Sequence, residues 1–91
     1  MREKEIEKYL VDKIKSVGGK AFKWVSPGNA GVPDRIVFLP EGKIFFIELK
    51  APGNTPTALQ SAKHRELKKL GHTVLVIDNK IQVDRFIETE V

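Results

Sequence analysis

The feature that most constrains this fold is a pair of apolar segments, residues 36–39 and 44–47, separated by Pro40-Glu41-Gly42. Proline suits the second position of a type I turn, and glycine suits the left-handed position that follows. The three residues therefore predict a hairpin loop with a glycine bulge. Because both segments are apolar on both faces, we expect other elements to cover the hairpin on both sides.

The rest of the chain supplies those elements. A helix is predicted at the N-terminus from apolar residues at helical spacing, which are Ile6, Leu10, Ile14 and Val17. Residues 20–26 predict a strand, 27–33 a loop and 73–77 another strand. Thr55 as N-cap and Pro56 as first helical residue predict a helix to about residue 70, and residues 82–89 predict a short last helix. This order predicts an α/β fold, a small mixed sheet flanked by helices.

Length and composition narrow the class of protein. Ninety-one residues predict a single domain over 1–91, and the net charge of +4 is a mild indication of a nucleic-acid partner. The absence of cysteine excludes disulfides, thiolate zinc sites and cysteine nucleophiles, and agrees with a cytoplasmic location. No apolar run approaches the roughly 20 residues of a membrane span, so we expect no membrane partner.

The hairpin register brings acidic residues together. If Leu39 faces Lys43, then Asp34 faces Glu48 on the neighbouring strand. Opposed residues have β-carbons about 4.5–5.5 Å apart on one face, where two carboxylates repel unless a cation lies between them. Lys50, two residues after Glu48, points to the same face. Two carboxylates and a lysine are therefore predicted to converge at the strand ends.

Oxygen ligands without cysteine or histidine suit Mg²⁺ or Mn²⁺. Such a cation polarises a phosphoryl oxygen, and an adjacent ammonium orients water or stabilises charge on phosphorus, so the group predicts phosphodiester hydrolysis. The alternative is that Asp34 is an ordinary turn residue and that Glu48 and Lys50 form an edge-strand salt bridge. A glutamate inside an apolar strand favours the functional interpretation, because it is costly unless paired or liganded.

Two motifs also resemble a known family. Gly31-Val32-Pro33-Asp34-Arg35 followed by Phe46-Ile47-Glu48-Leu49-Lys50 resembles the signature of PD-(D/E)xK nucleases. More narrowly, the chain resembles the virus-type replication-repair nuclease (VRR-NUC) domain. The narrower resemblance rests on Lys23-Trp24-Val25-Ser26-Pro27-Gly28, Ala51-Pro52-Gly53 and Gln60.

The resemblance implies a restriction-endonuclease-like core with Mg²⁺ or Mn²⁺ as cofactor. It implies that Asp34, Glu48 and the backbone carbonyl of Leu49 bind the metal. Lys50 matches the catalytic lysine, and Gln60 matches a glutamine near the active site. Glu7 matches an acid on the first helix of Holliday-junction-resolvase-like members, and Glu3 remains an alternative for that acid.

We predict DNA contacts from the loop over residues 27–31 and from the basic helix that carries Lys63, Arg65, Lys68 and Lys69. The predicted DNA-binding residues are Lys23, Ser26, Asn29, Arg35 and Lys63. His64 shares a helical face with Gln60 but is predicted to lie on a solvated side. Trp24 is predicted to pack in the core, and His72 to have no chemical role.

The leading functional hypothesis is a metal-dependent, structure-directed DNA endonuclease that resembles phage proteins. The resemblance further implies a homodimer that acts on branched DNA such as a four-way junction, whose paired cuts suit a two-fold axis. A non-catalytic DNA-binding module that retains the nuclease fold is the first alternative. A small structural or interaction protein whose acids form surface salt bridges is the second.

Overall fold

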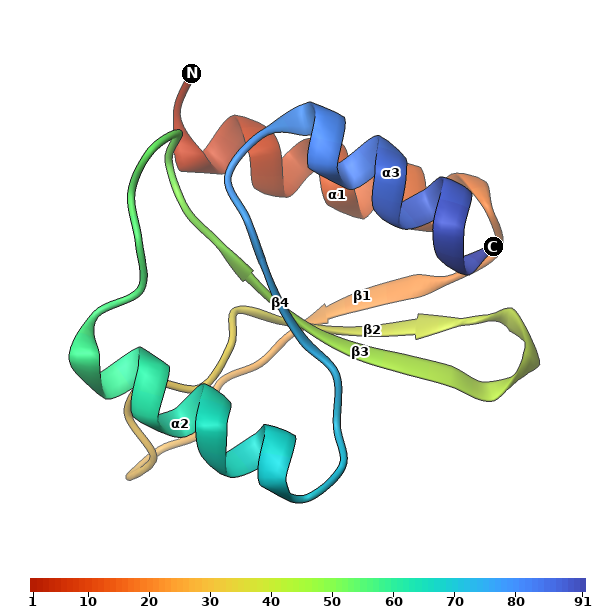
Figure 1. Ribbon diagram of the computed structural model, residues 1–91. Helices are drawn as coiled ribbons and strands as arrows, with labels where there is room; N and C mark the ends of the chain where they lie inside the picture. Colours follow the sequence, from red (N-terminus) through yellow and green to blue (C-terminus); the bar gives the residue numbers. More distant parts are fainter.

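The computed structural model describes residues 1–91 as three helices packed around a four-stranded sheet (Figure 1). The elements in chain order are α1 (Glu3–Ser16), β1 (Lys20–Lys23), β2 (Arg35–Leu39), a 3-10 turn (Pro40–Gly42), β3 (Lys43–Leu49), α2 (Ala58–Lys69), β4 (Val74–Ile77) and α3 (Lys80–Glu90). The order of helices and strands is the one predicted. None of the helices is long and apolar enough to cross a membrane.

The sheet has the order β1-β2-β3-β4, with two antiparallel pairings followed by a parallel pairing of β3 with β4. The predicted hairpin register is confirmed, because Phe38 pairs with Ile44 and Ile36 pairs with Phe46. The parallel pairing requires a crossover, and α2 provides it. The mixed α/β sheet of the prediction is therefore the fold observed.

The two faces of the sheet are covered differently. Helices α1 and α3 lie side by side over one face, and α2 lies against the other at one end of the sheet (Figure 1). The core fills the α1/α3 side, where its buried members are Ile6, Leu10, Ile14, Val37, Leu39, Phe45, Ile47, Leu49, Ile77, Val83 and Phe86. The side chain of Tyr9 ties the two helices together, since its hydroxyl donates to Asp84 Oδ1 at 2.7 Å.

The prediction that the hairpin is covered on both sides is wrong for its outer half. Phe22, Phe38 and Ile44 are 56%, 38% and 48% exposed. Phe22 and Phe38 contact each other edge to face, with ring centroids 5.8 Å apart. We call Phe22, Phe38 and Ile44 together the apolar face patch. It is open because α2 covers only the end of the sheet that lies away from the hairpin turn (Figure 1).

Helix α2 begins two residues later than predicted. Thr57, not Thr55, is the N-cap, because its hydroxyl accepts the backbone N–H of Gln60. Gln60 completes a capping box by accepting the N–H of Thr57 on its side-chain oxygen at 2.9 Å. This reciprocal pair satisfies two free N–H groups at the helix start, an advantage that Thr55 would lack because Ala58 would be its N3 residue.

The turn between β2 and β3 keeps its predicted length but not its predicted conformation. Leu39 pairs with Lys43, so the loop has three residues. Glu41 as well as Gly42 has positive φ, at 69° and 76°. A glutamate in the left-handed region is unfavourable relative to glycine, because its β-carbon crowds the backbone.

The other element boundaries differ from prediction by a few residues. β1 ends at Lys23, and α3 begins at Lys80 with Asn79 as its N-cap. The Asn79 side chain accepts the N–H of Gln82 at 2.8 Å. With this cap, the helix begins at Lys80, two residues before the predicted start at residue 82.

Candidate active site

Asp34 and Glu48 lie at the same end of two paired strands. Arg35 and Ile47 form the last pair of the β2–β3 ladder, and Asp34 and Glu48 are the next residues beyond them. Asp34 follows the buried Pro33, and its Oδ2 accepts the backbone N–H of Leu49 at 2.9 Å. The Glu48 side chain, with 2% of its surface exposed, faces away from the α1/α3 core. The alternative of a surface salt bridge at Glu48 does not fit this burial.

Lys50 joins the carboxylates from the end of β3. Its Nζ lies 3.6 Å from Glu48 Oε2, and its side chain is 14% exposed. Its backbone N–H donates to Ile77 O at 3.0 Å, which extends the β3–β4 pairing by one step. The backbone that carries the lysine is therefore held in the sheet while the ammonium reaches the carboxylate.

Gln60 contacts Glu48 from the first turn of α2. Its Nε2 donates to Glu48 Oε2 at 3.2 Å, while its oxygen is engaged by the N–H of Thr57. Because the capping box occupies the oxygen, the amide group must direct its NH₂ toward the carboxylate. The predicted proximity of Gln60 to the acidic residues is thus explained by a local helix-capping motif.

His64 is the residue that the sequence interpretation placed incorrectly. It is 5% exposed rather than solvated, and its Nε2 lies 3.6 Å from Glu48 Oε1. Neither of these two buried atoms has a hydrogen-bond partner. The available sequence signal was the four-residue spacing from Gln60, which places both side chains on one face of α2.

The surroundings of Glu48 disfavour its charged form. The pKa of Glu48 is raised from 4.5 to about 7, chiefly by burial and next by the neighbouring Asp34 charge, while Lys50 acts in the opposite direction. Burial lowers the pKa of His64 below its usual 6.5, and the charges of Lys68 and Lys50 act in the same direction. In the metal-free protein, a neutral imidazole therefore faces a carboxyl group that titrates near neutral pH.

The donor set fits a hard divalent cation. The site offers carboxylates from Asp34 and Glu48, and the buried Glu48 Oε1 has no hydrogen-bond partner. The Leu49 carbonyl lies in the adjoining peptide. No group of three or more His, Cys, Asp or Glu residues surrounds one point, as a closed zinc site would require. Mg²⁺ retains several waters and is commonly held by one or two carboxylates, which agrees with this sparse set of ligands.

The two candidate acids of α1 have different surroundings. Glu7 forms an ion pair with Arg35, with Nε and Oε2 2.9 Å apart and both side chains about one-fifth exposed. Glu3 lines a polar hollow of about 460 Å³ beside Lys50. The remaining lining residues are Ala51, Gly53, Asn54 and Thr55. Of the two acids, Glu3 is the one whose surface adjoins the lysine.

Two predicted DNA-binding residues have partners within the protein. Arg35 bonds to Glu7 and also donates from Nη1 to Ala21 O at 2.9 Å. The structure therefore gives Arg35 a folding role instead of an exposed position for DNA. Lys63 pairs with Glu66 at 3.0 Å and is 22% exposed.

The loop between β1 and β2 carries the other predicted contacts. Lys23 is exposed at the end of β1. Asn29 donates to Ser26 Oγ at 3.0 Å, which closes a small turn. Gly31 contacts α2 so closely that an added β-carbon would lie 2.8 Å from Leu59 O. Trp24 is half-buried against Phe46, with ring centroids 5.3 Å apart, and lies outside the buried core in which it was predicted to pack.

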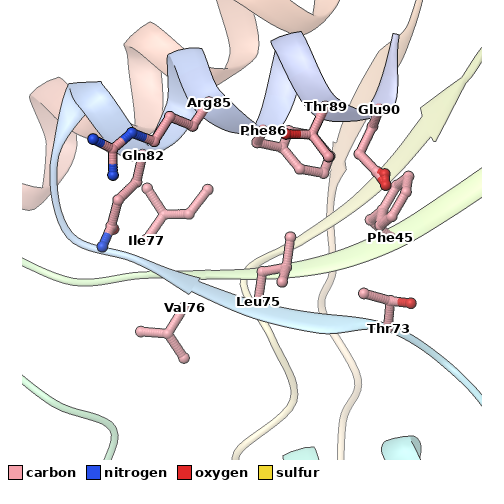
Figure 2. Close-up of a pocket in the computed structure, with 10 residues that line it drawn as sticks. All are labelled: Phe45, Thr73, Leu75, Val76, Ile77, Gln82, Arg85, Phe86, Thr89 and Glu90. Carbon is pink, nitrogen blue, oxygen red and sulfur yellow. The ribbon is translucent and has the colours of Figure 1, made fainter.

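A separate hollow of about 370 Å³ lies between β4 and α3 (Figure 2). Phe45, Leu75 and Phe86 line it together with Arg85, Gln82 and others. None of Asp34, Lys50, Gln60 and His64 belongs to this lining. Val76, which pairs with Glu48 in the sheet, contributes to it. The hollow is therefore distinct from the carboxylate site.

Comparison with known proteins places this chain among nuclease domains. The chain is 54% identical over 80 residues to a protein named "Putative nuclease p44" of Acyrthosiphon pisum secondary endosymbiont phage 1, covering 88% of this chain and 86% of that protein. A solved structure described as a VRR_NUC domain superimposes with a TM-score of 0.90 at 33% identity, over 98% of this chain and 97% of that one. No family model matches the sequence.

Proposed function

The chain belongs to the VRR_NUC family of nuclease domains, and from this premise we propose that it is a metal-dependent endonuclease that hydrolyses DNA phosphodiester bonds. The observation that carries the proposal is the environment of Glu48. This carboxylate is buried beside Asp34, with Lys50 3.6 Å away. A buried acid with a strongly raised pKa in such a cluster is characteristic of a functional site.

Each residue of the cluster has a proposed role. Asp34, Glu48 and the carbonyl of Leu49 hold Mg²⁺ or Mn²⁺. When bound, the cation supplies a Lewis acid that polarises the phosphoryl oxygen. Lys50 orients the attacking water and stabilises the negative charge that develops on the phosphoryl oxygens. Gln60 keeps Glu48 in position through its amide hydrogen bond.

The α1 acids divide their roles in this proposal. Glu3 is the helix acid that faces the substrate, because it adjoins Lys50 across the polar hollow. Glu7, the residue first matched to the family's acid, holds Arg35 and so supports the start of β2 immediately after Asp34. Exchanging Glu3 and Glu7 separately for glutamine distinguishes these roles, since only the first exchange should lower cleavage without lowering stability.

We further propose that the substrate is branched DNA, with a four-way junction as the leading candidate, and that the enzyme acts as a homodimer. A domain of 91 residues has little surface with which to read sequence, and its +4 charge favours contacts to the backbone. Paired cuts on a four-way junction suit a two-fold dimer. The apolar face patch (Phe22, Phe38 and Ile44) offers a surface on which a second copy can pack. We propose that this activity takes place in the cytoplasm of a bacterial or phage-infected host cell.

A cleavage assay tests the enzymatic proposal. Wild type, Asp34→Asn and the control Asp12→Asn are incubated with a labelled four-way junction in Mg²⁺, in Mn²⁺ and in EDTA. Asp12 is an exposed aspartate on α1 that pairs only with Lys8. We expect wild type and the control to cut with metal, and Asp34→Asn to lose about 100-fold or more of that activity. Metal-independent binding without cleavage by wild type would instead identify a DNA-binding module.

The dimer has its own test. Sedimentation analysis of wild type should give twice the monomer mass, and Phe38→Glu, which places a charge in the apolar face patch, should give a monomer. The Phe38→Glu variant should still make single cuts in the junction but should lose the paired cuts. A wild-type protein that sediments as a monomer on a junction would contradict the proposed assembly.

A further inference from the structure

His64 has no role assigned by the site as described so far, although it is one of only two polar or charged side chains among the buried residues. The other is Glu48, the side chain that it faces. The 3.6 Å between His64 Nε2 and Glu48 Oε1 is slightly beyond a hydrogen bond, and both atoms are otherwise without partners. A buried polar group without a partner is unfavourable, so two such atoms facing each other favour a hydrogen bond between them.

We infer that His64 is a positioning residue that donates its Nε2–H to Glu48 Oε1 and fixes the carboxylate for metal binding. This inference rests on the proposed metal site. Helix α2 then holds both oxygens of one carboxylate, with His64 at Oε1 and Gln60 at Oε2, 3.2 Å from its amide nitrogen. The two holders are four residues apart and so project from the same face of the helix.

Holding both oxygens has a physical purpose. Glutamate has three rotatable side-chain bonds, and a metal ligand that moves between rotamers loses affinity. The capping box with Thr57 already orients Gln60, which leaves the carboxylate free to pivot about Oε2 unless Oε1 is also held. His64 supplies that second point from a rigid helix. The contact competes little with the metal, since each carboxylate oxygen has two lone pairs.

Two substitutions separate hydrogen bonding from space filling. His64→Gln places an amide N–H at about the reach of Nε2, whereas His64→Leu fills similar space without a donor. Mn²⁺ binding to the DNA-free protein is measured by calorimetry at pH 8.5. We expect His64→Leu to weaken Mn²⁺ binding about 10- to 100-fold and His64→Gln to remain within about threefold of wild type. Equal binding by His64→Leu, or equal loss in both variants, overturns the inference.

A second measurement needs neither metal nor catalysis. Imidazole ¹H–¹⁵N correlation spectra of metal-free wild type at pH 8.5 report which ring nitrogen carries the proton. We expect the Nε2–H tautomer in wild type and a change of the Nε2 resonance in Glu48→Gln. A wild-type Nδ1–H tautomer overturns the inference even if His64→Leu fails to fold. Failure of wild type to cut DNA would refute the proposed function but leave this spectroscopic result readable.

Discussion

Glu48 should make the metal-free protein progressively less stable as the pH rises. In the unfolded chain its carboxyl ionises near 4.5, but in the folded protein it keeps its proton until about pH 7. Between these values the folded state binds more protons than the unfolded state, so the free energy of unfolding falls with rising pH. The contribution of Glu48 to the free energy of unfolding is fully present below pH 4.5 and is lost as the pH rises through about 7. Glu48→Gln, which cannot ionise, should remove this dependence.

The size of the effect follows from the raised pKa. A change from 4.5 to about 7 corresponds to about 3 kcal/mol between the two ends of the window. Little of this is weakened by solvent, because only 2% of the Glu48 side chain is exposed. A domain of this size has a total stability of about 5–15 kcal/mol, so the loss is a large fraction of it. At pH 8 without metal, Glu48→Gln should therefore be more stable than wild type.

Urea unfolding followed by the fluorescence of the single Trp24 measures this prediction in EDTA from pH 4.5 to 8. The quantity of interest is the free energy of unfolding of wild type minus that of Glu48→Gln. His64 affects the free energy of unfolding in the opposite direction. Because burial lowers its pKa in the folded protein, the unfolded state binds more protons, and the free energy of unfolding rises as the pH rises toward 6.5. The subtraction cancels that contribution to first order. Glu88→Gln, an exposed exchange on α3, serves as the control.

Adding Mg²⁺ at pH 8 should stabilise wild type and leave Glu48→Gln nearly unchanged, because binding to the folded state alone raises its stability. A wild-type-minus-variant difference that stays flat from pH 4.5 to 8 would refute the raised pKa. A difference that grows in favour of wild type would refute the sign of the argument. The wild-type free energy of unfolding minus that of Glu88→Gln should stay flat over the same pH range, because the control variant keeps Glu48.

Four further substitutions test the local backbone and the helix contacts by urea unfolding. Gly31→Ala should destabilise by about 2–4 kcal/mol, because φ is +89° and the new β-carbon would lie 2.8 Å from a carbonyl of α2. Gly53→Ala, with φ of +81° but nothing within 4 Å, should cost only about 1–2 kcal/mol; an equal loss in the two variants would contradict the close contact. Glu41→Gly should stabilise by about 0.5–1 kcal/mol by relieving a φ of 69°, and a destabilised variant would show that the turn tolerates glutamate without strain. Tyr9→Phe should lower the free energy of unfolding by about 1 kcal/mol, because it removes the hydrogen bond to Asp84. An unchanged urea midpoint would show that this hydrogen bond makes no net contribution to stability.

The part of the site on β2 and β3 was predictable because it depends on local rules. A three-residue turn sets the register of its hairpin, and a strand alternates its side chains with a period of two. Those two rules suffice to bring Asp34, Glu48 and Lys50 to one face at one end of the sheet. The observed pairs of the ladder confirm the register on which the prediction depended.

The contribution of α2 was predictable only in part. The 3.6-residue period indicates that Gln60 and His64 share a face, but it does not say whether that face meets solvent or a carboxylate. The parallel crossover between β3 and β4 decides this, since it lays α2 against the sheet end that carries Glu48. For this reason the sequence predicts a solvated His64, although the side chain is 5% exposed in the structure.

The sequence alone thus determined the order of the elements, the register of the central hairpin and the chemical nature of the acidic cluster. Each of these follows from residues close in the chain, where turn geometry and side-chain period leave few options. Tertiary structure alone decided that Glu7 pairs with Arg35 while Glu3 adjoins Lys50. It also decided that a histidine faces Glu48 and that the apolar face patch is open. These contacts join elements distant in the chain, and their formation depends on how the helices pack on the sheet.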